Sequence, residues 1–185
     1  MIKFFGLLSK KKKVKPATAV SIYVALLKNV ISEGFVEIKD FINNNNNLAS
    51  NPNIDDSDID WFSNVVFLGN MKNLEMYFEE DEVSILRALI LDELYIDIEE
   101  NTQHLAVERF LDYENYFKDL LVKHELPINA MAHAIFEKYN INDFQGDLFK
   151  KKNKPNPVFL NELKNLLNHF IWNWREYLEK NKLNF

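Results

Sequence analysis

Apolar residues recur along most of this chain at spacings of three and four, the period of an α-helix. Glycine occurs only four times, so the punctuation of strands and tight turns is scarce. The pattern predicts an all-α fold, a single-domain bundle of about six to seven helices. We expect residues 1–15 to be a flexible or peripheral segment, basic and apolar, and residues 16–185 to form the helical domain.

The first helix is predicted over residues 17–32, because Pro16 can begin it and Gly34 can end it. A short helix over residues 35–42 follows. Residues 43–53 are rich in asparagine and lack any apolar period, so they are predicted to form a loop.

Asp58 is placed to cap the next helix, with a possible break at Gly69. Residues 83–95 are apolar around too much of their circumference for a surface helix. We therefore expect this helix and the one over residues 17–32 to be the two broadly apolar central helices. Residues 96–99 alternate with period two, which allows a short extended segment.

The second half of the chain has clearer helix signals. Residues 102–124 keep a regular apolar spacing, and another helix is predicted over residues 127–139. Asn156 followed by Pro157 is a strong start signal for the last helix. Its apolar residues recur at heptad spacing and need a partner helix: Leu160, Leu163, Leu167, Phe170, Trp174 and Tyr177.

The composition of the chain excludes several kinds of catalytic and metal-binding site. Hydrophobic residues make up 47% of the 185 positions, too many for a disordered chain. No cysteine is present, which excludes disulfides, thiolate metal sites and cysteine nucleophiles. Phosphate-binding glycine motifs and the G-x-S-x-G turn are also absent. Together with the lack of a long apolar run, these features predict a non-enzymatic cytoplasmic protein without a cofactor or a transmembrane segment.

Charge is distributed unevenly. Residues 55–100 contain fourteen acidic residues against Lys72 and Arg87, a net charge of −12 in a chain whose total is −6. Concentrated negative charge accelerates association with a positive partner. The leading hypothesis is a protein-binding protein that docks a basic protein partner through an acidic surface, as an inhibitor or immunity-type protein would.

The predicted protein-binding residues are four consecutive acids and one tryptophan: Glu79, Glu80, Asp81, Glu82 and Trp172. Four adjacent acids cannot all face a core, so some must remain in solvent. Trp172 is two residues from Trp174 and therefore points away from the heptad seam. It is either covered by another part of the chain, such as the N-terminal segment, or exposed as an interface anchor.

The first alternative is a helical metal-binding protein or metalloenzyme. His104 with Glu108, and His133 with Glu137, are pairs four residues apart, so each pair shares a helix face and offers a nitrogen and an oxygen. The same spacing is also ordinary on a solvated helix surface. His124 needs no functional role, because a cation near a helix C-terminus is favourable.

The second alternative is a peripheral membrane adaptor held by residues 1–13, where phenylalanines and leucines precede Lys10, Lys11, Lys12 and Lys13. Direct nucleic-acid binding is not expected. The lysine runs carry no interleaved arginines, and the sequence pI is near 5.3.

Overall fold

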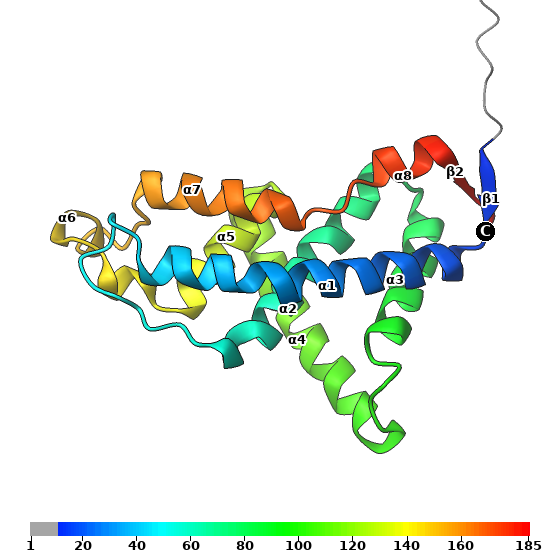
Figure 1. The fold of residues 1–185 in the computed structure, drawn as a ribbon, viewed down its shortest axis with the longest axis horizontal. Helices are drawn as coiled ribbons and strands as arrows, with labels where there is room; N and C mark the ends of the chain where they lie inside the picture. The colour runs from blue at the N-terminus through cyan, green and yellow to red at the C-terminus, as the bar shows by residue number, and fades with distance from the viewer. Residues whose placement is uncertain (1–10) are drawn as a thin grey trace, which may run out of the picture.

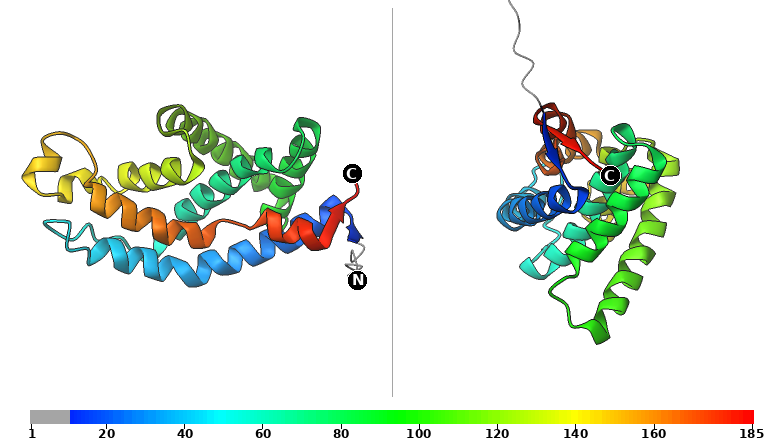
Figure 2. Two further views of the ribbon diagram at one scale, coloured as in Figure 1. Left: turned by 90° about the horizontal axis from the view of Figure 1, so that it is seen from above. Right: turned by 90° about the vertical axis from the view of Figure 1, so that its right-hand side faces the viewer.

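The computed structural model describes residues 11–185, apart from the side chain of Glu100. This part of the chain is an all-α bundle with one small sheet (Figures 1 and 2). The α-helices are α1 (Pro16–Asn43), α2 (Ile59–Asn73), α3 (Glu80–Leu94), α4 (Glu100–His124), α5 (Pro127–Lys138), α6 (Asp147–Lys150), α7 (Pro157–Leu167) and α8 (Trp174–Lys180). The predicted all-α, single-domain bundle is confirmed.

Short elements connect the helices. The 3-10 segments are η1 (Asp56–Asp58), η2 (Leu74–Met76), η3 (Ile141–Phe144) and η4 (Asn168–Phe170). The strands β1 (Lys12–Val14) and β2 (Asn181–Leu183) form a parallel pair that joins the two ends of the described chain.

The α1 helix runs the length of the molecule, and the α7–α8 segment returns along it in the opposite direction (Figures 1 and 2). Nine apolar residues of α1 are buried, and the helix contacts α2, α3 and α7. By length and composition alone α1 could span a membrane, a test that the core helix of a folded domain also passes.

The predicted break of this first helix is wrong. One continuous helix passes through Gly34, which has no positive φ and needs no special backbone conformation. A Cβ at Gly34 would lie 2.7 Å from the ring of Phe170. The glycine is therefore there for close packing, which the sequence alone did not reveal.

The expected central position of residues 83–95 is also wrong. Helix α3 buries only Val83, Leu86 and Ile90, whereas α2 buries nine consecutive or nearly consecutive residues between Trp61 and Met71. The α2 helix contacts α1, α4 and α5. It also continues through Gly69, where a Cβ would collide with the sulfur of Met131 on α5.

The predicted last helix is interrupted. Helix α7 ends at Leu167, and the chain passes through η4 and an extended residue, Ile171, before α8 begins at Trp174. Asn173 caps α8 by accepting the backbone N–H of Glu176. The heptad spacing was therefore produced by two helices that share one buried side, not by one long helix.

The extended segment allowed for residues 96–99 does not form. The chain there turns between α3 and α4, and this turn projects from the body of the bundle with the adjoining ends of the two helices as an arm (Figure 1). Helix α3 itself packs on α1, and the end of α4 packs on α5. Glu114 on α4 is buried and pairs with Arg87 of α3 and Lys118 of α4. Burial raises the pKa of Glu114, but the hydrogen bond and charge of Arg87 outweigh this and lower it overall.

Candidate functional site

The predicted acidic quartet lies at the start of α3, where two of its members have a structural role. Glu79 is the N-cap, and its backbone N–H donates to the carboxylate of Glu82 at 3.1 Å, while the Glu79 side chain accepts from the third helical residue. This reciprocal capping box satisfies amides that would otherwise have no partner. Glu79 and Glu82 are therefore explained by helix initiation.

Glu80 and Asp81 are exposed in the same first turn. Within the described part of the chain, neither carboxylate takes part in an ion pair or a side-chain hydrogen bond. They complement the positive end of the helix dipole and otherwise face solvent. These two acids remain available for a partner.

The solvent side of α3 extends this negative surface. Asp81, Ile85, Ala88 and Asp92 are all exposed and follow the helical spacing of one face. Ile85 is 45% exposed, although it lies between acids on a helix that has a core side available. An apolar side chain on the charged face is the arrangement found at the centre of interfaces with a polar rim.

The turn after α3 continues the surface at the tip of the arm (Figure 1). Ile96 is 64% exposed, Ile98 is also exposed, and Asp97 and Glu99 lie beside them in the chain. We define the acidic face as eight residues: Glu80, Asp81, Ile85, Asp92, Ile96, Asp97, Ile98 and Glu99. Sequence reasoning missed its three isoleucines, because Ile85 was assigned to a buried helix and Ile96 and Ile98 to a short extended segment.

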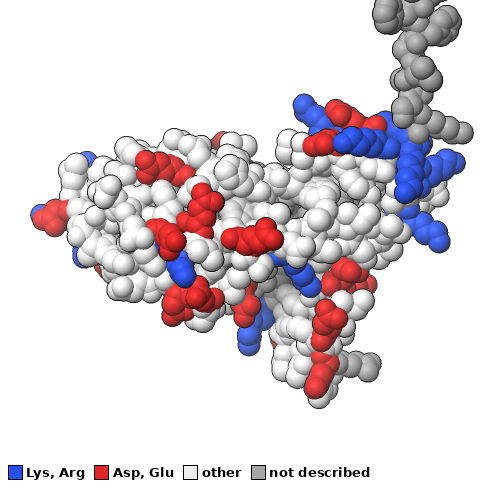
Figure 3. Space-filling view, in the orientation of Figure 1, with Lys and Arg blue, Asp and Glu red and all other residues white. Residues whose placement is uncertain are grey.

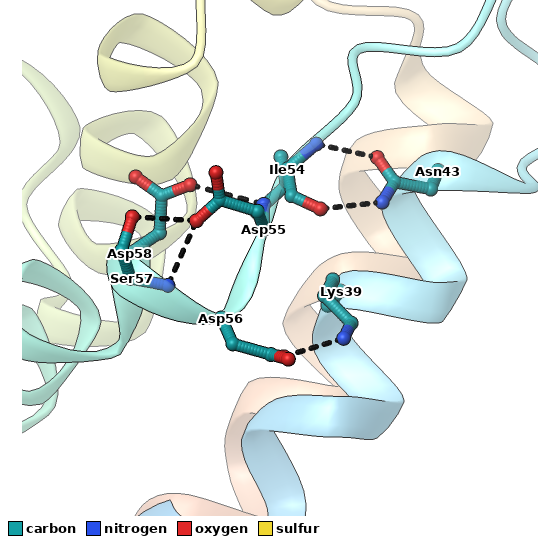
Figure 4. Close-up of polar contacts among 7 residues, drawn as sticks. All are labelled: Lys39, Asn43, Ile54, Asp55, Asp56, Ser57 and Asp58. Atoms are coloured by element: carbon teal, nitrogen blue, oxygen red, sulfur yellow. Dashed lines mark hydrogen bonds and ion pairs between the residues drawn. The ribbon is translucent and has the colours of Figure 1, made fainter.

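Many other acids of residues 55–100 have local partners. Asp55 and Asp58 form a second capping box at η1, and Lys39 donates to Asp56 at 2.5 Å (Figure 4). The Ser57 hydroxyl and backbone N–H both donate to Asp55 and lower the pKa of its carboxyl. These acids hold the loop before α2 against α1 and are not free for docking.

Two further acids of residues 55–100 also have local partners. Glu75 pairs with Lys72, and Glu93 accepts the hydroxyl of Ser21 at 2.8 Å. Asn43, the last residue of α1, holds the loop between α1 and η1 through two hydrogen bonds with the backbone of Ile54 (Figure 4). Twelve of the fourteen acids counted from sequence therefore belong either to caps and local pairs or to the acidic face; the others are Asp60, which is exposed, and Glu100, whose side chain is outside the described structure.

Trp172 is half-buried, between the two alternatives considered from sequence. Its ring packs against Tyr23 of α1 at 5.7 Å, Trp174 at 6.1 Å and Tyr177 at 6.1 Å between centroids. Its backbone N–H donates to Asn70 at 2.7 Å. The cover comes from α1 and α8, while residues 1–10, the other cover considered, lie outside the described residues.

A cavity of about 280 Å³ opens beside this ring, lined by Ile171, Trp172, Asn173, Glu176, Tyr177, Lys180 and Asn181. The Tyr23 hydroxyl and the indole N–H groups of Trp172 and Trp174 are buried and lack a hydrogen-bond partner among the described residues, so they do not face the open solvent of this cavity. Burial raises the pKa of Tyr23. The cluster is a packing feature of the core.

The two predicted sites occupy the same end of the molecule. Phe78 packs edge-on against Trp174 at 5.2 Å and immediately precedes the acidic quartet. Trp172 contacts Trp174, but within residues 11–185 its side chain makes no hydrogen bond with any of the four acids. Trp172 and the acids are therefore connected only indirectly, through the packing of Trp174 on Phe78.

The histidines adopt an arrangement that was not predicted. His133 on α5 stacks on His124 at the end of α4, with ring centroids 3.5 Å apart and planes inclined by 10°. Glu137 accepts the hydroxyl of Tyr116 at 2.8 Å. Burial, with His124 as the next cause, lowers the pKa of His133 to about 4. Two stacked neutral rings direct their nitrogens along parallel planes and do not converge on one point.

His104 is exposed near the start of α4, far along the helix from His124. Across residues 11–185, the side chains that the structure describes contain no group of three or more His, Asp or Glu residues placed to hold a metal ion. The two His–Glu pairs are thus not joined into a common metal centre.

Comparison with known protein families, with curated proteins and with solved structures gave no match for this chain.

Proposed function

We propose that this chain is a non-enzymatic protein-binding protein, and that its acidic face docks a basic protein partner. An inhibitor that neutralises a basic effector is one form such a protein takes. The observation that carries the proposal is the combination of unpaired exposed acids with exposed Ile85, Ile96 and Ile98 along α3 and the turn that follows it.

The two kinds of side chain have different roles in such a surface. Exposed carboxylates steer a positive partner and raise its association rate, with little effect on dissociation. Apolar side chains that become buried at the centre of an interface contribute mainly to its lifetime. Helix α3 presents both along one face, and the Arg87–Glu114 pair holds α3 to α4 so that the arm presents a fixed shape.

The experiment begins with an affinity pull-down from the native cell, followed by binding kinetics with the purified partner. The test variant Asp81→Asn/Asp92→Asn removes two acids of the face, and Asp112→Asn/Asp119→Asn removes two exposed acids of α4 outside it. We expect the first variant to slow association by roughly threefold to tenfold at low salt, and the second to have a much smaller effect. Ile85→Ser should mainly speed dissociation.

Raising salt from about 50 to about 500 mM should remove most of the difference between the two variants, because screening shortens the reach of surface charge. Association that is equally slow for both variants would assign the effect to net charge alone. Binding that is insensitive to salt and to both variants would reject the acidic face as the docking surface.

A further inference from the structure

The pairing of β1 with β2 brings two basic segments together at one end of the molecule (Figures 1 and 3). In the parallel register Lys13 is the direct partner of Lys182, and Val14 is the partner of Leu183. Val14 and Leu183 are buried, whereas Lys13 and Lys182 are exposed on the outward side. Like charges directly opposite one another on neighbouring strands are destabilising, so this pair favours a bound anion.

Other basic side chains surround this pair. The basic end, as we define it, consists of seven exposed residues: Lys11, Lys12, Lys13, Lys15, Arg175, Lys180 and Lys182. Glu176 and Glu179 of α8 lie among these cations, and Glu176 pairs with Lys180 at 3.1 Å. The acids at the start of α3 are also near, because Phe78 packs on Phe185 at 6.1 Å. Within β1, β2 and α8 the cations outnumber the acids, although the total charge of the chain is −6.

An uncharged apolar stripe adjoins the basic end. From Pro16 to Ser32, helix α1 contains no acid and only one cation, Lys28. Ile22, Leu26 and Val30 are spaced by four and are 40–47% exposed, so they form a stripe on the solvent side of α1. Figure 3 shows this part of α1 as a white area with basic side chains at its end.

We propose that the basic end and this stripe of α1 together bind an anionic lipid membrane surface. Lysines beside exposed aliphatic side chains are the pattern of interfacial binding, in which cations meet lipid headgroups and apolar side chains enter the boundary below them. A site that binds phosphate backbones alone would have no use for Ile22 and Leu26.

One further feature agrees with this surface. The tip of the arm points away from β1, β2 and α8 in Figures 1 and 2. An anionic membrane attracts the basic end and repels Asp97 and Glu99 at the tip, so these charges favour an orientation with the tip toward the aqueous side. Glu80 and Asp81 lie nearer the basic end and reduce the attraction.

The test is co-sedimentation of the full chain with phosphatidylcholine vesicles containing about 30% phosphatidylserine, compared with pure phosphatidylcholine vesicles. Lys13→Gln/Lys182→Gln should lower binding to the anionic vesicles by roughly tenfold, and should leave the melting temperature unchanged or slightly higher. The matched control is Lys152→Gln/Lys154→Gln, which removes two exposed lysines at the other end of the molecule and should leave binding nearly unchanged.

The apolar stripe has its own control pair. Leu26→Gln should weaken vesicle binding severalfold, whereas Val122→Gln, which changes an exposed apolar residue of α4, should not. Failure to sediment with anionic vesicles at about 50 mM salt would overturn the proposal. Equal loss in the two lysine variants would also overturn it, as would binding to a single-stranded oligonucleotide without binding to vesicles. Because the acidic face is not changed in any of these variants, none of these results bears on the proposed protein partner.

Discussion

The side-chain amide of Asn70 donates to the carbonyl oxygen of Phe170 at 2.8 Å, and so joins the last turn of α2 to the break between α7 and α8. The same amide group donates to Val66 at 2.9 Å, and its oxygen accepts the backbone N–H of Trp172 at 2.7 Å. Asn70 is almost completely buried. One polar side chain thus satisfies the backbone groups that become free where the predicted long helix ends.

Replacing this side chain tests its role directly. Asn70→Leu keeps the volume but leaves the Phe170 carbonyl and the Trp172 N–H without partners, so we expect the free energy of unfolding to fall by about 2 to 4 kcal/mol. Urea unfolding followed by circular dichroism measures it. Asn115→Leu, at an exposed position of α4, should change stability by no more than about 0.5 kcal/mol. Similar effects in the two variants would contradict this assignment.

Gly69 tests close packing between α2 and α5. In Gly69→Ala the new methyl group would collide with the buried side chain of Met131, and we expect a loss of about 1 to 3 kcal/mol despite the better helix propensity of alanine. Gly146→Ala is the control, because a Cβ there meets nothing within 4 Å. A melting temperature raised by Gly69→Ala would show that Met131 moves aside at little cost.

The His124–His133 stack predicts an acid-sensitive fold. His133 has a folded pKa of about 4, below its value of ~6.5 in an unfolded chain. The unfolded chain therefore binds more protons between these values, and stability is lost as the pH falls from about 6.5 towards 4. The charged groups that face the pair are Glu137, which opposes the shift, and Lys123 and Lys164, which add to it.

His133→Gln should remove about 1 to 3 kcal/mol of this pH dependence, since the ring is only half-buried and solvent screens part of the effect. Chemical unfolding at a series of pH values compares the variant with the wild type. His169→Gln changes an exposed histidine of η4 and should leave the slope unaltered. An unchanged slope in His133→Gln would mean that carboxylates alone cause the acid sensitivity.

Trp172 is expected to contribute to stability, because its ring packs on Tyr23, Trp174 and Tyr177. Trp172→Ala should lower the free energy of unfolding by about 2 kcal/mol, less than for a fully buried tryptophan. Trp172→Phe should recover part of the loss. Unfolding followed by circular dichroism provides the measurement. If Trp172→Ala leaves stability unchanged and only weakens partner binding, the ring is an interface anchor instead.

The capping box at α3 separates structural acids from free ones. Glu79→Ala should lower stability by about 0.5 to 1 kcal/mol, because the first turn loses a hydrogen-bond acceptor. Glu80→Ala, one residue later, should stay within about 0.5 kcal/mol of the wild type. Thermal unfolding of the two variants compares adjacent acids of equal charge. Equal effects would indicate that only the charge near the helix dipole matters.

The sequence by itself determined the helical class and most helix positions. Helices α4, α5 and α7 begin or end at residues whose local chemistry is visible in the chain, such as Pro127, Asn156 and Pro157. Apolar spacing also identified much of the buried side of α1, including Tyr23 and Leu27. These features depend on neighbours within one or two turns, which a sequence displays directly.

Only the tertiary structure decided what depends on distant partners. Gly34 and Gly69 were predicted to break helices, but the structure shows that they allow close packing against Phe170 and Met131. The helix after Asn156 was predicted to be continuous, but it ends where Asn70 donates to the carbonyl oxygen of Phe170. The pairing of Lys13 with Lys182 and the stack of His133 on His124 likewise join segments from separate elements. The exposure of side chains on α3 also depends on distant residues. Periodicity shows which residues of a helix share a face, whereas the packing of the other helices decides which faces are covered.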